Sequence, residues 1–203
     1  MTHLIRMTYA FYSILIICAA LAAFYFRFEK HKQRARRLVL IAVMTALSVL
    51  GRFVFAVIPA FKPVTAVTII SAIWLGPECG FLVGSLSALI SNFYFGQGPW
   101  TPFQMFALGL LGLFAALLSA PLKKSCIALS AYAAFAAIFY SCVMDIWTVL
   151  WFSEGFAPSL YLAAIVSALP HMLLYAASNI IFLLLLGRPF GAKLQRIITK
   201  YDI

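Results

Sequence analysis

Charged side chains are scarce in this chain of 203 residues, and acidic ones are scarcer still. Charged residues make up 10% of the sequence, with 5 Asp and Glu against 15 Lys and Arg, whereas hydrophobic residues make up 65%. This composition excludes a soluble globule of this size, which would need more polar surface. In hydrocarbon the backbone must satisfy its own hydrogen bonds, and the long apolar runs lack the alternation of barrel strands. The sequence therefore predicts an all-α, polytopic bundle of transmembrane helices.

Catalytic and metal-binding motifs are also missing from the sequence. It contains no GxxxxGK[ST] phosphate loop, no HExxH metal pair and no GxSxG nucleophile elbow. The four cysteines show no CxxC or Cys/His ligand spacing, so they are interpreted as small packing residues. We expect no catalytic residue, no metal site and no cofactor, and any active transport must be powered by another protein.

The basic residues cluster at the ends of the apolar segments, a pattern that marks membrane orientation rather than nucleic-acid binding. With every strongly basic link on the cytoplasmic side, the N-terminus lies outside and the C-terminus inside. We expect an N-terminal anchor and basic link (1–35), a six-helix core (36–187) and a basic cytoplasmic tail (188–203). The predicted spans are residues 8–28, 38–59, 64–76, 80–95, 103–120, 126–151 and 159–186.

The first apolar segment has two interpretations. Ala20-Leu21-Ala22 resembles a cleavage site, which would make the segment a signal peptide. However, the basic residues between Arg27 and Arg37 follow the segment and outweigh Arg6 before it. This order favours a retained anchor.

Polar and aromatic residues gather in the outer third of the predicted bundle. A charge inside a span costs roughly 2.5 to 3.5 kcal/mol, so Arg52 and Asp145, at matched depth, predict an ion pair that is either structural or part of a solute site. Interfacial aromatic belts look similar, but apolar walls with a few placed polar groups are typical of small-molecule pockets. The candidate substrate-binding residues are Arg52, Lys62, Asn92, Gln97, Trp100, Gln104, Asp145 and Trp147.

Small residues characterise the inner half. Ala42 and Ala46 form a small-xxx-small pair on the second segment, and 80–88 contains another, patterns that usually serve helix packing. On the last segment His171 and Asn179 could line a path, although a satisfied core histidine is the more common interpretation for His171. Pro170 is expected to kink this helix.

These features resemble the substrate-binding S components of energy-coupling factor (ECF) transporters. The resemblance covers roughly residues 36–186. It rests on the six-helix core, on the AVMTA pattern at 42–46, and on the run from Lys62-Pro63 to Trp100-Thr101-Pro102. The extra N-terminal span departs from the usual six helices.

The resemblance implies a subunit of the bacterial plasma membrane that captures a vitamin or similar micronutrient at its outer face. It implies docking, through the helix bearing Ala42 and Ala46, on a transmembrane T component driven by two cytoplasmic ATPases. The subunit would then topple in the membrane to release its cargo.

The solute expected from the resemblance is a corrinoid of the cobalamin type, because the segment 62–104 looks most like those S components. Queuosine or another heterocyclic micronutrient fits the same residues. A membrane-embedded enzyme using Asp145, His171 or Arg52 is the alternative from another class, and a scaffold that binds no solute is a third. His171 lies deeper than Asp145, which disfavours the enzyme, and a scaffold would not need the polar outer turn.

Overall fold

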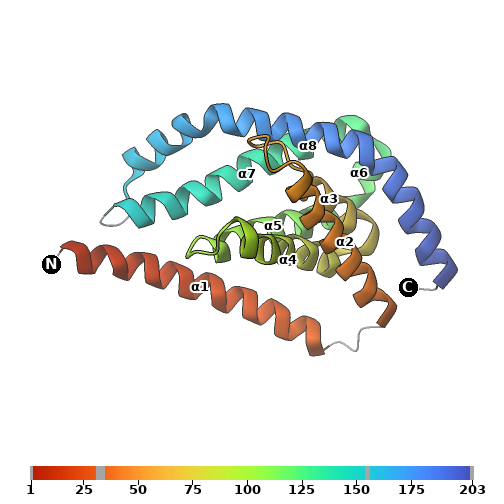
Figure 1. The fold of residues 1–203 in the computed structure, drawn as a ribbon, viewed down its shortest axis with the longest axis horizontal. Helices are drawn as coiled ribbons and strands as arrows, with labels where there is room; N and C mark the ends of the chain where they lie inside the picture. The colour runs from red at the N-terminus through yellow and green to blue at the C-terminus, as the bar shows by residue number, and fades with distance from the viewer. Residues whose placement is uncertain (1, 31–34, 154–155, 202–203) are drawn as a thin grey trace.

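The computed structural model describes residues 2–30, 35–153 and 156–201, and these residues are helical apart from short links. The helices are packed into one bundle (Figure 1), as the all-α prediction required. Their bounds are α1 Thr2–Lys30, α2 Ala35–Val54, α3 Val64–Leu75, α4 Pro77–Phe95, α5 Thr101–Leu117, α6 Ser119–Lys124, α7 Cys126–Phe152 and α8 Pro158–Tyr201.

In the described part of the chain, α1, α2, α7 and α8 are each long and apolar enough to cross a membrane unaided. Apart from the short helix α6, α3 is the shortest of the described helices. Its 12 residues extend only about 18 Å, well below the roughly 30 Å of a bilayer core. Every residue of α3 from Val64 to Ile73 is buried. Neighbouring helices therefore shield α3 from lipid, and it forms the centre of the bundle.

Helices α4 and α5 approach each other at backbone distance. A Cβ atom on Gly112 would lie 2.3 Å from the carbonyl oxygen of Gly80, and one on Gly84 would lie 2.5 Å from the carbonyl oxygen of Leu108. Only glycine allows this approach, which is the use that small residues serve between membrane helices. This contact fixes the rotation of α4 relative to α5. The end of α4 and the start of α5 therefore lie side by side, joined by the turn 96–100.

Helix α1 packs against the rest of the bundle along one side (Figure 1). Its Phe24 stacks on Phe81 of α4 with ring centroids 3.8 Å apart, and the hydroxyls of Tyr25 and Ser85 lie 2.8 Å apart. Further along, Ala10 is buried with Phe103 of α5 and Trp147 of α7. α1 therefore contacts α4, α5 and α7, although most of its surface stays outside the bundle.

Helix α8 continues well past residue 186, where the sequence predicted the last span to end. It runs to Tyr201 with Pro170 and Pro189 inside it, and it curves over the bundle to end near the start of α2 (Figure 1). Arg36 of α2 donates a hydrogen bond to the carbonyl of Tyr201, and Trp74 of α3 packs on Gly191. The helix extends beyond the predicted span because the basic segment keeps buried positions at Gly191 and Leu194, which give it a face to pack. The short helix α6 was not predicted either.

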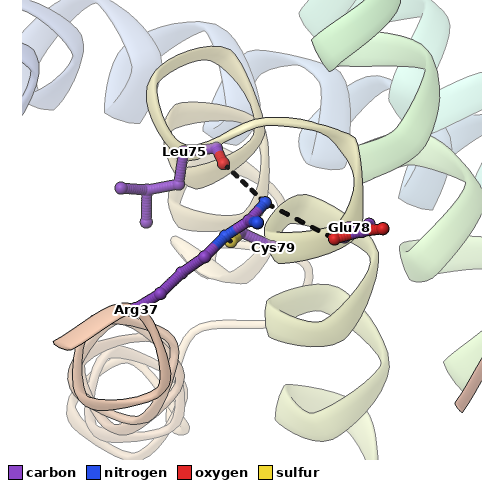
Figure 2. A network of polar contacts seen from close by, with 4 residues as sticks. All are labelled: Arg37, Leu75, Glu78 and Cys79. Carbon is purple, nitrogen blue, oxygen red and sulfur yellow. Dashed lines mark hydrogen bonds and ion pairs between the residues drawn. The ribbon is translucent and has the colours of Figure 1, made fainter. Parts of the chain in front are cut away.

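The start of α2 is fastened to the turn between α3 and α4 (Figure 2). The guanidinium of Arg37 lies 3.5 Å from the carboxylate of Glu78, donates to the Cys79 sulfur at 3.1 Å, and donates to the Leu75 carbonyl at 3.5 Å. Gly76, between the two helices, has a φ of 93°, a conformation that favours glycine. We call this end of the bundle, which carries Arg37, Lys123, Lys124 and Arg188, the basic end.

Candidate functional site

A cavity of about 210 Å³ lies toward the other end of the bundle. It is enclosed by the end of α2, the link 55–63, the start of α3, and α5, α7 and α8. Most of the residues that line it are polar or aromatic, and a few are aliphatic. They are Arg52, Ala60, Lys62, Val64, Gln104, Leu108, Tyr140, His171 and Tyr175.

A chain of hydrogen bonds connects one wall of the cavity through four helices. Arg52 of α2 donates to the hydroxyl of Ser91 and, at 3.0 Å, to the amide oxygen of Asn92 on α4. Asn92 donates to the amide oxygen of Gln104 on α5 at 2.7 Å, and Gln104 donates to the hydroxyl of Tyr140 on α7 at 3.1 Å. Each side chain is oriented by the next, so Arg52 and Gln104 present their groups to the cavity in a set geometry.

Aromatic rings form the adjoining wall. The rings of Tyr140 and Tyr175 meet at a centroid distance of 5.4 Å, and the Tyr175 hydroxyl is hydrogen-bonded to Thr65 of α3. The ring of His171 lies nearly parallel to that of Tyr175, with centroids 6.3 Å apart. His171 is exposed, so it stands at the edge of the cavity. This wall offers flat faces to a planar ligand.

The link 60–63, which includes Lys62, covers one side of the cavity. Ala60 adopts a φ of 58°, a left-handed conformation that a non-glycine residue rarely takes. The link is tied to α8, because the Lys62 amide donates to the Ser178 hydroxyl at 3.0 Å. Burial, and then the nearby Arg52, lowers the pKa of Lys62, since both disfavour a second positive charge at this place.

The eight residues predicted from the sequence as substrate-binding fall into three groups. Arg52, Lys62 and Gln104 line the cavity, and Asn92, only 1% exposed, lies directly behind them. Gln97 and Trp100 contact the turn itself: Gln97 donates to the Leu89 carbonyl at 2.9 Å and accepts from Thr101 at 2.9 Å, while the Trp100 ring covers Gly98. These two residues shape the turn that positions Asn92 and Gln104.

Asp145 and Trp147 form the third group and do not line this cavity. Among the residues that the structure describes, Arg52 and Asp145 form no ion pair, so that prediction was wrong. Arg52 is directed to α4, and one carboxylate oxygen of Asp145 is buried without a hydrogen-bond partner. Trp147 is buried between Phe103 and Trp151, with ring centroids at 5.4 and 4.9 Å, and stabilises the contact between α5 and α7.

Three lining residues were missed or misread from the sequence. Tyr140 and Tyr175 lie within apolar spans, and a buried tyrosine hydroxyl needs a partner, which was the available signal. His171 was expected to be a core histidine, but it is exposed beside the cavity. The other residue considered on α8, Asn179, is buried and donates to the Ala133 carbonyl at 3.3 Å.

The helical bundle, its cavity of about 210 Å³ and the oriented polar wall can be compared with known families. The family model described as the ECF-type riboflavin transporter, S component, matches residues 32–195 of the chain. The chain belongs to this family of S components. No curated protein and no solved structure matches it.

Membership establishes a multi-pass membrane protein that serves as the binding subunit of a transporter, and not an enzyme. S components bind a vitamin and associate with T and ATPase subunits. The matching model names riboflavin, so the corrinoid expected from the segment 62–104 has no support from this comparison. The match begins at residue 32, which leaves α1 outside it.

Proposed function

We propose that this S component captures riboflavin, or a closely related flavin, in the 210 Å³ cavity and delivers it for ATP-driven uptake by its partner subunits. The observation that carries the proposal is the match to the riboflavin-type family model over residues 32–195. The chemistry of the cavity walls supports it.

Riboflavin has a flat, uncharged ring system, ring carbonyls that accept hydrogen bonds, and a polyol chain. The faces of Tyr140 and Tyr175 suit such a ring, since aromatic groups pair by offset stacking or edge contacts. Arg52 and Gln104 stand on the adjoining wall as donors for the carbonyls. Lys62 and His171, at the edge, are placed to meet the polyol.

The size of the cavity also favours a flat vitamin over a corrinoid. Its volume lies below the roughly 300 to 1,000 Å³ typical of drug-sized ligand pockets, so it suits a small flat ring better than a large corrinoid. A corrinoid would require the link 60–63 and α8 to move away from α2. Queuosine and other heterocyclic micronutrients are the alternative substrates, and queuine, the base of queuosine, represents them in the binding experiment.

We also propose that the exposed face of α2 docks on the T component. Ala42 and Ala46 are both exposed on this face, and their neighbours Val43 and Leu47 are exposed as well. Small residues let another helix approach closely. α1 packs on α5 and α7, which leaves this face of α2 available.

In the proposed orientation the basic end faces the bacterial cytoplasm and the cavity opens outside. Its support is the positive-inside rule, since Arg36, Arg37, Lys123, Lys124 and Arg188 gather at one end. We propose that α1 is retained as a seventh span with its N-terminus outside. Its contacts with Phe81, Ser85 and Trp147 support retention, because cleavage would expose them.

The test is a titration of the purified protein with riboflavin, followed by quenching of flavin fluorescence, with cobalamin and queuine as competitors. Gln104→Ala removes a donor from the cavity and is expected to weaken binding about tenfold, the equivalent of one hydrogen bond of about 1.4 kcal/mol. Gln195→Ala is the matched control, because Gln195 is exposed near the other end of α8 and does not line the cavity. Binding of cobalamin without binding of riboflavin would overturn the proposal.

A further inference from the structure

A second cavity, of about 100 Å³, lies at the basic end between α3, α6, α7 and α8. Its interior is apolar and includes Ile70 and Leu183, while its rim carries three cations, Lys123, Lys124 and Arg188. Among the residues that the structure describes, no acidic one lines it. We call it the basic slot.

Contacts within the protein hold two of these cations over the basic slot without neutralising them. The Lys123 ammonium lies 4.5 Å from the ring centroid of Trp74, and the Arg188 guanidinium donates to the Cys126 sulfur at 3.6 Å. Within the described residues, none of the three cations has a carboxylate partner. An oriented cluster of positive charge without a counter-ion is what a phosphate group would neutralise.

A large apolar groove of about 640 Å³ adjoins the basic slot, and Leu122 of α6 lines both. The groove runs between α5 and α7, with Leu117, Ala131 and Phe135 on its walls. Leu117 is 70% exposed, so the groove is open to the surroundings. From Cys126 at the slot to Phe135 is about 14 Å along α7, which matches half of a roughly 30 Å bilayer core.

We propose that the basic slot and the apolar groove form one binding site for an anionic phospholipid. The phosphate lies on Lys123, Lys124 and Arg188, and one acyl chain lies along α7 in the groove. A soluble phosphate would satisfy the cations but leave the groove open, and a neutral lipid would fill the groove but leave the cations unpaired. Basic pockets between helices at a cytoplasmic surface are suited to anionic headgroups.

The site uses the proposed orientation of the basic end but not the identity of the vitamin. A lipid bound here would contact α3, α6, α7 and α8 together, so it would stabilise the bundle at the end opposite the vitamin cavity. Failure of lipid binding would leave the vitamin proposal untouched, because flavin binding is measured separately.

The experiment compares the full-length protein in nanodiscs of phosphatidylcholine with and without phosphatidylglycerol, using melting temperature and native mass spectrometry of retained lipid. The triple variant Lys123→Gln, Lys124→Gln, Arg188→Gln is expected to retain phosphatidylglycerol on the order of a hundredfold less well, or about fivefold for each cation. The triple variant Lys193→Gln, Arg196→Gln, Lys200→Gln removes the same charge from exposed positions of α8 and should behave as wild type.

A second variant separates a lipid from a free phosphate. Ala131 is exposed in the groove, so Ala131→Trp fills the acyl site without disturbing buried residues, and it should lower lipid retention while all three cations remain. Stabilisation by inorganic phosphate equal to that by phosphatidylglycerol would overturn the proposal. Equal lipid retention by the two triple variants would do so as well.

Discussion

Asn92 is the residue on which the oriented wall of the vitamin cavity depends, although it lies behind that wall. It accepts a hydrogen bond from Arg52 at 3.0 Å and donates to Thr101 at 3.0 Å and to Gln104 at 2.7 Å. The substitution Asn92→Ala removes all three bonds at once. Because the side chain is 1% exposed, water cannot readily replace them.

The magnitude follows from the kinds of bonds that are lost. The bond from the Arg52 guanidinium involves a charge and contributes about 1.5 to 3 kcal/mol. The two neutral bonds contribute about 0.6 kcal/mol each, the average for interhelical bonds in a membrane protein. Asn92→Ala should therefore destabilise the protein by on the order of 3 kcal/mol. If half of this appears in ligand binding through a misplaced Arg52 and Gln104, affinity should fall about tenfold.

The assay combines flavin fluorescence quenching with melting temperature, and Asn92→Asp is the control. Asp keeps the size and the acceptor for Arg52, Gln104 can turn its amide to donate to Asp and accept from the Tyr140 hydroxyl, and the Thr101 hydroxyl can donate to Asp instead of to Gln97. Asn92→Asp should therefore stay close to wild type, whereas Asn92→Ala should not. Wild-type affinity and melting temperature for Asn92→Ala would refute the role of Asn92 as the hub of the wall.

Three further predictions follow from the packing. Trp147→Ala should lower the free energy of unfolding by about 3 kcal/mol, because the indole is buried away from the cavity. Flavin affinity should stay unchanged in the same titration, and a large loss of affinity would show that Trp147 belongs to the binding site. Gly112→Ala should destabilise the bundle by about 1 to 3 kcal/mol in a thermal melt, whereas Gly187→Ala, where a Cβ meets its nearest neighbour at 3.6 Å, should be neutral or stabilising. Ala42→Trp should spare flavin binding and abolish uptake by cells that carry the partner subunits, and the exposed Ala163→Trp on α8 should leave uptake intact.

For much of the candidate site, the sequence predicted the depth at which each residue lies in the membrane. Arg52, Lys62, Asn92 and Gln104 were placed together in the outer third of the bundle, and the structure does bring these four together. The same reasoning failed for Asp145, which shares that depth but does not pair with Arg52. Two residues at the same depth contact each other only if their helices are neighbours and the side chains point toward each other, and depth alone gives neither condition.

Helix ends were predictable where an apolar run stops at proline or glycine, as at the turn between α3 and α4. They were not predictable where a polar segment continues a helix by packing one face, as in α8 beyond residue 186. Local propensity and hydropathy cannot reveal the distant partner, here Trp74 on Gly191, that makes such a continuation stable.

The amino-acid sequence by itself determined that this protein is a helical membrane bundle, that it belongs among the S components, and how far along its helix each polar residue lies. Rise per residue and hydropathy are local properties, and they suffice for the bundle and for these positions, whereas membership follows from the match to the family model. Only the tertiary structure decided which residues face one another. The rotation of each helix is set by contacts such as Gly80 with Gly112, and it turned Arg52 toward Asn92 and brought Tyr140 and Tyr175 into the wall of the cavity.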